Sequence, residues 1–266
     1  MGYDRVVNAP TTPTNWREIL KAPTLGDHIV QVYQDEEFLA EAVGEYAGVG
    51  LRQDEGVLII TTPGHRLAFE RRLGRTGVDT AKAVAQGQLQ FLDADAVLAE
   101  FMRDGMPDWN AFHVLVGAVI AELRLQYPTV RAYGEMVDIL WQQGERDAAI
   151  RLEEFWNELG KLQTFSLFCA YFMDNLDAGA YGGPLECVCK VHTHLIPARD
   201  YGRFNDAVAE ASRKVLDEPL SRMMISLAAT RRPGTEMPLG QAVLLWLQKN
   251  MPRTAEKVLS EIRARA

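Results

Sequence analysis

The feature that most constrains the fold of this chain is a regular alternation between short apolar runs and longer stretches with helical periodicity. Five runs have the character of strands, at residues 28–33, 57–62, 88–92, 130–140 and 165–172. The run at 57–62 is apolar and β-branched at almost every position, as expected of a parallel strand buried on both faces. Because parallel strands need crossover connections, the pattern predicts an α/β fold with a parallel sheet of at least five strands, covered by helices on both faces.

The pattern changes after a glycine-rich loop at residues 177–184. From there to the end of the chain we predict helices, at residues 185–196, 201–216, 219–229, 238–249 and 253–265. The first residues, rich in proline and threonine, resemble a mobile arm with a helical turn near 16–20. We therefore divide the chain into a flexible N-terminal arm (1–27), an α/β domain (28–197) and an all-helical C-terminal extension (198–266).

Charge and hydropathy exclude several classes of protein. The net charge of −8 argues against a general binder of nucleic acid or of an anionic membrane. The apolar runs are too short to span a bilayer, and residues 1–25 lack the apolar core of a signal peptide. Three cysteines are too few for a disulfide framework in a chain of 266 residues. We therefore expect a cytoplasmic protein that does not associate with membranes.

The loop after the first predicted strand lacks the chemistry of a nucleotide-binding protein. A phosphate cradle needs glycines, whose backbone N–H groups approach phosphate oxygens, together with a lysine and a serine or threonine. Residues 33–37 read Tyr-Gln-Asp-Glu-Glu, with no glycine and no lysine, and three carboxylates there would repel a triphosphate. The sequence therefore disfavours ATP hydrolysis by the P-loop mechanism and predicts no cofactor.

Several segments of the chain resemble one known family. They are HIVQVYQDEEFLAEAVGEYAGVGLRQDEGVLIITTPGHR (28–66), GQLQFLDA (87–94), VRAYGEMVDILWQQG (130–144), LEEFWNELGK (152–161) and FSLFCAY (165–171). Together they are similar to the MEDS family, the methanogen/methylotroph, DcmR sensory domain, over roughly residues 28–197. The resemblance implies a RecA-like three-layer sandwich that has lost its nucleotide-binding motifs. It also implies a role in sensing small molecules such as hydrocarbon derivatives, in association with histidine kinases or DNA-binding modules.

Polar side chains near the predicted strand ends form the predicted ligand site, because ligands of open parallel sheets bind beyond the carboxyl ends of the strands. The set comprises Tyr33, Thr62, His65, Arg66, Asp93, Glu135 and Tyr171. Glu135 interrupts an apolar strand, so it either contacts a ligand or is satisfied by Arg131 or by a neighbouring helix end. His65 and Arg66 begin the next helix, where they either hold an anion or form a solvated helix start.

The segment at 187–194 contains two cysteines and two histidines, which are residue types that zinc favours. On a helix, Cys189 and His192 form an i, i+3 pair, whereas Cys187 and His194 share another face. Such a pair supplies two ligands, and zinc usually takes four. The sequence therefore predicts no metal site, with Cys189 and His192 kept as weak candidates for a metal, ligand-contact or redox pair. We expect Cys169, inside an apolar strand, to pack as a small hydrophobe.

The C-terminal extension differs in charge from the rest of the chain. Residues 199–266 carry 12 basic and 8 acidic side chains, a net of +4, whereas residues 1–198 carry a net of −12. The helices predicted at 238–249 and 253–265 resemble a DNA-binding helix-turn-helix. Their apolar faces must be buried, however, so we favour packing on the body, on a second subunit in a homodimer, or on a signalling protein such as a histidine kinase.

These observations favour a non-catalytic signal-transduction sensor or adaptor. A small molecule of unknown identity would bind at the strand ends, and the helical tail would then signal to a protein partner. Two alternatives stay open. One is a residual nucleotide-binding ATPase or another enzyme that uses Glu135 and Asp93. The other is a DNA-binding transcriptional regulator that acts through the basic tail.

Overall fold

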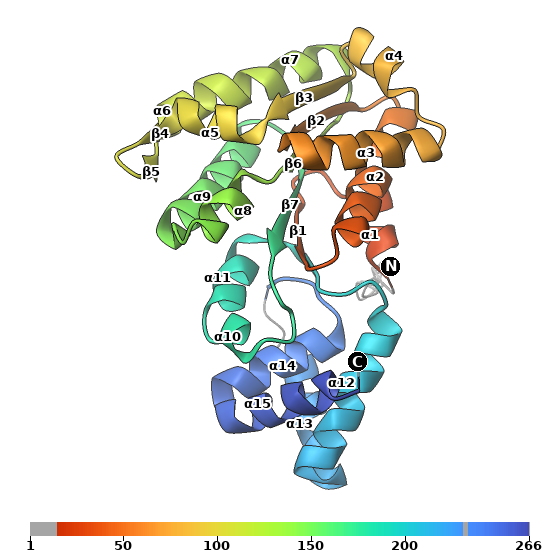
Figure 1. The fold of residues 1–266 in the computed structure, drawn as a ribbon, viewed down its shortest axis with the longest axis vertical. Helices are drawn as coiled ribbons and strands as arrows, with labels where there is room; N and C mark the ends of the chain where they lie inside the picture. Colours follow the sequence, from red (N-terminus) through yellow and green to blue (C-terminus); the bar gives the residue numbers. More distant parts are fainter. Residues whose placement is uncertain (1–14, 231–233, 266) are drawn as a thin grey trace, which may run out of the picture.

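The computed structural model describes residues 15–230 and 234–265, and a six-stranded parallel sheet lies at its centre (Figure 1). The strand order is β3-β2-β6-β7-β1-β8, and every pairing within this sheet is parallel. The strands are β1 (His28–Tyr33), β2 (Gly56–Thr61), β3 (Leu89–Asp93), β6 (Val130–Gly134), β7 (Ser166–Phe172) and β8 (His194–Ile196). The predicted α/β class, with at least five parallel strands and a helical C-terminal region, is confirmed.

Two helical layers cover the sheet, because successive strand residues point to opposite faces. The core on one face is shared with α1 (Trp16–Lys21), α2 (Glu36–Arg52), α3 (Pro63–Arg75) and α4 (Thr80–Ala85). The core on the other face is shared with α5 (Ala94–Phe101), α6 (Trp109–Phe112), the π-helical turn η1 (His113–Gly117), α7 (Ala118–Gln126), α8 (Met136–Gln142) and α9 (Arg146–Leu162). A short hairpin of β4 (Met102–Arg103) and β5 (Met106–Pro107) follows α5.

The structure corrects the prediction of a single helix at residues 185–196. A short helix, α10 (Ala178–Tyr181), lies inside the glycine-rich loop, and α11 (Pro184–Val191) ends before β8. β8 adds a sixth strand, with Leu195 opposite Val30 of β1. Three residues are too few for an alternation pattern to reveal, so this strand is defined by its long-range pairing with β1 rather than by its own sequence. The strand predicted at 130–140, which the sequence also allows to continue into a turn of helix, ends at Gly134, and α8 begins at Met136.

The C-terminal extension consists of α12 (Tyr201–Leu216), α13 (Glu218–Thr230), α14 (Leu239–Asn250) and α15 (Pro252–Arg263). These helices gather at one end of the molecule, and α10 and α11 lie between them and the sheet (Figure 1). The apolar faces of α14 and α15 are buried within this chain, through Val243, Leu244, Leu247, Val258, Leu259 and Ile262. The sequence allows these faces to pack on the body of the chain, on a second subunit or on a signalling protein, and in the structure they pack on the chain itself.

The extension is also joined to the edge of the sheet by backbone hydrogen bonds. The N–H of Leu195 donates to the carbonyl of Glu236 at 2.8 Å, and the N–H of Glu236 donates to the carbonyl of Thr193 at 2.7 Å. Glu236 therefore pairs with β8 as an isolated bridge and covers part of an otherwise open edge strand.

The helical turn predicted near 16–20 is confirmed by α1, which packs against the α/β domain. Trp16 and Leu20 are buried, and the indole Nε1 of Trp16 donates to the carbonyl of Arg199 at 3.0 Å. The first 14 residues of the predicted arm lie outside the described residues. Among the helices that the structure describes, none combines the length and the apolar character needed to cross a bilayer.

Candidate functional site

Polar side chains meet at the carboxyl ends of β1, β2 and β6, as the sequence predicts. Glu135, directly after β6, is 3% exposed and is the central acceptor. Its carboxylate accepts from the backbone N–H of Thr62, from Nδ1 of His65 at 2.8 Å and from the hydroxyl of Tyr133 at 3.3 Å. Tyr33, at the end of β1, lies beside this group, with its ring 6.4 Å from that of His65.

A second buried carboxylate, Asp138 of α8, extends this group. It accepts from the hydroxyl of Tyr33 at 3.1 Å, from the backbone N–H of Phe172 at 3.0 Å and from Nε2 of Gln142 at 3.0 Å. We call Tyr33, Thr62, His65, Tyr133, Glu135 and Asp138 the carboxyl-edge network. Six donors face its two carboxylates, so both are fully supplied with hydrogen bonds.

The electrostatics of the carboxyl-edge network follow from this arrangement. The hydrogen bond to Glu135 raises the pKa of His65, although partial burial acts in the opposite direction. Burial raises the pKa of Asp138, while its three hydrogen bonds act to lower it. Burial also raises the pKa of Tyr33, which keeps its phenol protonated and able to donate. The network is therefore polar but internally satisfied.

Arg131 is not the partner of Glu135, because it lies at the opposite end of β6. Its guanidinium forms an ion pair with Glu55 and donates to the carbonyls of Leu20 at 2.8 Å and Tyr46 at 3.1 Å. Glu135 is instead satisfied at the start of a neighbouring helix, which is the other structural explanation that the sequence offers.

Two predicted site residues lie outside the carboxyl-edge network. Arg66 forms an exposed ion pair with Glu70 at 3.0 Å and lies over the ring of Phe91. The carboxylate of Asp93 accepts from the N–H of Ala96 at 2.9 Å, which makes it the N-cap of α5. Both contacts are typical of a solvated surface and a helix start.

Tyr171, the last predicted site residue, belongs to a different group of side chains. Its hydroxyl donates to Glu153 of α9 at 2.7 Å, and this carboxylate is fully buried. Nε2 of His28 lies 3.1 Å from Oε2 of Glu153, and Nε2 of His192 lies 3.3 Å from Oε1. Sγ of Cys169 completes the group, 3.7 Å from Oε2. We call His28, Glu153, Cys169 and His192 the His–Glu–Cys cluster; their four ligand-type atoms lie within 4.8 Å of one another.

Of this cluster, only His192 is a candidate site residue from the sequence. His28, Glu153 and Cys169 are not predicted as site residues. A signal for Glu153 is present, because it follows Ala149 by four residues and precedes Trp156 by three, which places it on the apolar face of a helix. Cys169 and His28 share a face because β7 and β1 are neighbours, with Cys169 opposite Val30. No local sequence pattern predicts that β7 and β1 are adjacent.

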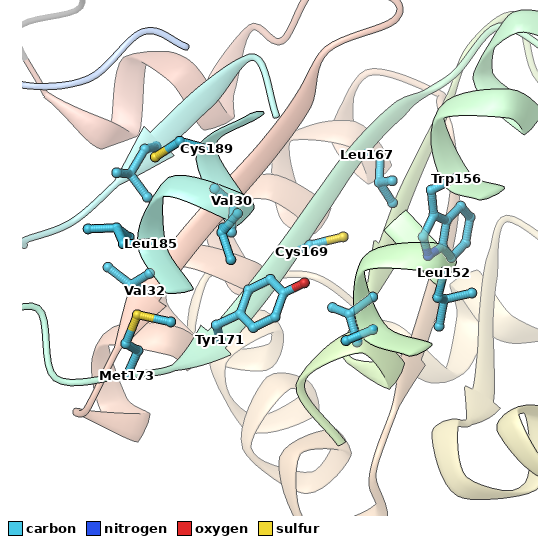
Figure 2. Packing of buried hydrophobic residues seen from close by; sticks show 14 of the residues in the cluster. Val30, Val32, Leu152, Trp156, Leu167, Cys169, Tyr171, Met173, Leu185 and Cys189 are labelled. Carbon is cyan, nitrogen blue, oxygen red and sulfur yellow. The ribbon is translucent and has the colours of Figure 1, made fainter. Parts of the chain in front are cut away.

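Cys189, the predicted partner of His192, lies outside the His–Glu–Cys cluster. In Figure 2, Cys169 and Tyr171 extend from β7 toward Leu152 and Trp156 of α9, whereas Cys189 lies well apart from them. Burial raises the pKa of the Cys189 thiol to about 12, so it is an inert, protonated group in this setting.

A cavity of about 740 Å³ lies between the α/β domain and the extension, and we call it the α11–α14 cavity. One wall comes from α11 and the segment after it, including Glu186, Cys189, Lys190 and His192. The other wall comes from the extension, including Ala242, Leu245, Trp246 and Lys249. A second cavity of about 530 Å³ is bordered by His28, Asn157 and again His192, so this histidine stands between the two spaces.

Comparison with known families agrees with this architecture. Residues 27–193 match the MEDS family, described as the MEthanogen/methylotroph, DcmR Sensory domain. The matched segment contains the carboxyl-edge network, the His–Glu–Cys cluster and one wall of the α11–α14 cavity. No curated protein sequence matches the chain. Because the matched segment covers well over half of its length, the chain belongs to the MEDS family of sensory domains.

Proposed function

We propose that this MEDS protein detects a small organic molecule in the α11–α14 cavity and passes the signal to a protein partner through its helical extension. The observation that carries the proposal is the composition of the cavity walls, because one wall belongs to the family domain and the other to the extension. Its volume of about 740 Å³ falls within the range of small-molecule sites. A ligand there would touch both parts at once.

The lining of the cavity suits a molecule with an apolar body and a polar group. Leu245 and Trp246 supply an apolar surface on the extension side. Glu186 and Lys190, paired at 3.3 Å, supply charge on the α11 side, and Lys249 adds a further cation. This mixture of apolar wall and few polar groups is typical of sites that orient a small ligand.

A route for the signal begins at the walls of the cavity. Gln241 of α14 donates to the hydroxyl of Tyr181, which lines the cavity, at 3.0 Å. α14 in turn contacts α12, α13 and α15, so a shift of α14 would alter the whole extension. Leu220 and Met223 of α13 are about half exposed and offer an apolar surface to a signalling partner. Ligand binding acts this way only if the two arrangements of α14 differ in affinity for the ligand.

The geometry favours this cavity over the other predicted sites and activities. The carboxyl-edge network stays a predicted ligand site, but its carboxylates are already satisfied within the chain. The enzyme alternative needs Asp93 beside Glu135, and Asp93 instead caps α5. The DNA-binding alternative relies on the four basic side chains at 253–265, and two of them are already engaged, because Arg263 pairs with Asp174 and Arg265 pairs with Glu210.

The test is a native mass spectrum of the full chain, followed by a thermal-shift panel of short alcohols, aldehydes and carboxylic acids. We expect a co-purified or added molecule to bind with one equivalent per chain and to change hydrogen exchange along α14. Trp246→Ala should abolish the shift, while the matched truncation Trp109→Ala, on α6 and outside the cavity lining, should keep it. Binding that survives Trp246→Ala with unchanged exchange in α14 would overturn the proposal.

A further inference from the structure

Glu153 has a buried carboxylate that is short of positive charge. It is 0% exposed and lies in the main apolar core of the protein. Among residues 15–230 and 234–265, its ion-pair partners are His28 and His192, and no lysine or arginine reaches it. A buried carboxylate is costly unless a cation or several hydrogen-bond donors compensate it. The number of donors around Glu153 therefore decides whether the cluster needs a cation.

Hydrogen bonds determine the tautomer of His28, and with it which ring nitrogen presents a lone pair to the carboxylate. The amide of Asn157 is oriented by its own donation to the carbonyl of Val191 at 3.0 Å, so its Oδ1 faces Nδ1 of His28 at 3.1 Å. Nδ1 must therefore carry the proton, which leaves Nε2 of the neutral ring as an acceptor. That Nε2 points at Glu153 and Cys169.

His192 presents the same arrangement from the other side. Its Nδ1 donates to the carbonyl of Val188 at 2.6 Å, so the neutral ring again offers Nε2 as a lone pair. This Nε2 makes no hydrogen bond with any described residue, although it lies 3.3 Å from Oε1 of Glu153 and its side chain is fully buried. The His28 and His192 rings lie only 4.0 Å apart, centroid to centroid.

The count of protons around Glu153 therefore does not balance. The Nε2 lone pair of His28 faces Oε2 of the carboxylate and that of His192 faces Oε1, while the single thiol proton of Cys169 is available to one acceptor. Protonating one ring still leaves the Nε2 lone pair of the other against a carboxylate oxygen, and protonating both would place two cations in contact, with ring centroids 4.0 Å apart. A metal ion resolves the conflict, because it accepts all of these lone pairs at once and takes the place of the thiol proton.

The spacing of the four ligand atoms is close to that of a tetrahedral site. With zinc bonds of about 2.0–2.3 Å, neighbouring ligand atoms stand about 3.3–3.8 Å apart. Nε2 of His28 lies 3.1 Å from Oε2 of Glu153 and 3.4 Å from Sγ of Cys169, and Sγ lies 3.7 Å from the same Oε2. Nε2 of His192 lies 3.3 Å from the other carboxylate oxygen, Oε1, and all four ligand atoms lie within 4.8 Å of one another. Imidazole nitrogen, carboxylate oxygen and thiolate sulfur are all ligands of zinc. We propose that the His–Glu–Cys cluster binds a divalent transition metal ion of the zinc type, with one ligand atom from each of its four residues.

The surroundings of the cluster have the features of an outer ligand shell. Both imidazoles donate their second nitrogen to oxygen acceptors, and Tyr171 donates to Glu153, as the partners of metal ligands commonly do. His28 and His192 border the cavity of about 530 Å³, which gives an ion a path to the cluster. The inference goes beyond the proposed function, since an ion can bind here whether or not the α11–α14 cavity takes an organic ligand.

Cobalt is the probe for the test, because a thiolate bound to Co²⁺ produces a charge-transfer absorption band. The full chain is stripped with a chelator, titrated with Co²⁺ and then back-titrated with Zn²⁺. We expect one equivalent to bind, with a charge-transfer band that Zn²⁺ abolishes. Cys169→Ser should remove the band, and the matched control Cys189→Ser, another buried thiol, should keep it. Glu153→Gln should weaken Co²⁺ binding by at least tenfold.

The wild-type protein alone can overturn the inference, even if the Glu153 variant does not fold. Failure of the stripped wild type to bind one equivalent of Co²⁺ or Zn²⁺ saturably would show that a proton, not a metal, joins the imidazoles to Glu153. A band that disappears in Cys189→Ser and persists in Cys169→Ser would place the metal elsewhere. Circular dichroism of each variant checks the fold. Either negative result leaves the organic ligand of the α11–α14 cavity untouched.

Discussion

The two polar groups of the sheet contain similar residues and differ in how donors and acceptors balance. In the carboxyl-edge network, six donors face the carboxylates of Glu135 and Asp138. In the His–Glu–Cys cluster, Tyr171 donates to Glu153, but two imidazole lone pairs also point at it. The comparison teaches that a buried carboxylate alone does not identify a binding site. The number of hydrogen-bond donors around the carboxylate distinguishes a structural site from a site that requires a cation.

The largest expected effect tests whether the carboxyl-edge network is structural. Glu135→Ala leaves the Thr62 N–H and the Tyr133 hydroxyl without an acceptor, so we expect the free energy of unfolding to fall by about 3–5 kcal/mol. Urea denaturation followed by circular dichroism measures it. The exposed control Glu70→Ala should change this free energy by less than about 0.5 kcal/mol. A loss under about 1 kcal/mol for Glu135→Ala would mean that the network is not an anchor.

Metal removal should affect one group and not the other. At a free Zn²⁺ concentration 100 times the Kd, we expect the unfolding free energy of the wild type to rise by about 2.7 kcal/mol over the chelated protein. Glu135→Gln should show the same zinc-dependent increase, whereas Glu153→Gln should lose most of it. Equal increases in the two variants would contradict the assignment of the ion to Glu153. Paired urea titrations with zinc and with chelator give both values.

A pair of tyrosine substitutions sharpens the contrast, because each tyrosine donates to one buried carboxylate. Tyr171→Phe removes a donor from Glu153, and we expect metal affinity to fall by about 10–100-fold. Tyr33→Phe removes a donor from Asp138 and should cost about 1 kcal/mol of unfolding free energy without changing that affinity. Co²⁺ titrations and urea curves on both variants separate the two effects. A weaker metal site in Tyr33→Phe would refute the independence of the two groups.

The smallest expected effect is a pH dependence at the carboxyl edge. The folded-state pKa of His65 is raised, so the stabilisation from its protonated form is fully present below about pH 6.5 and is lost as the pH rises through the folded value. Besides Glu135, the carboxylates of Glu36 and Asp138 also raise this pKa. We expect His65→Gln to reduce the change in unfolding free energy across this pH range by about 0.2–1 kcal/mol. Unfolding curves at several pH values test the difference.

Much of the fold can be predicted because its elements carry local signals. β1 and α12 begin and end at the predicted residues. β8 escapes prediction because three residues carry no periodicity and its strand conformation depends on β1, more than 160 residues earlier. Local chemistry therefore defines the helices and long strands, while topology defines the short edge strand.

The same distinction applies to the two groups of polar side chains. Thr62 ends a predicted strand, His65 follows it and Glu135 interrupts another, so the rule that ligands bind at the carboxyl ends of parallel strands groups them. The His–Glu–Cys cluster draws His28 from the start of β1, Cys169 from the middle of β7 and His192 from the residues before β8. Only the strand order β7-β1-β8 makes these positions neighbours, and the sequence does not reveal that order.

The position of β1 between β7 and β8 also has a consequence for biosynthesis. β1 is the first strand to be made, yet its hydrogen-bonding partners begin at Ser166 and His194. At about 5–20 residues per second, a ribosome needs about 7–27 s to reach β7 after completing β1. During that interval the apolar strand has only nearby helices such as α2 to cover it, so a chain that stalls before β7 exposes an unpaired, aggregation-prone edge. A strand that is paired on both sides in the finished sheet is thus unpaired on both sides for most of synthesis.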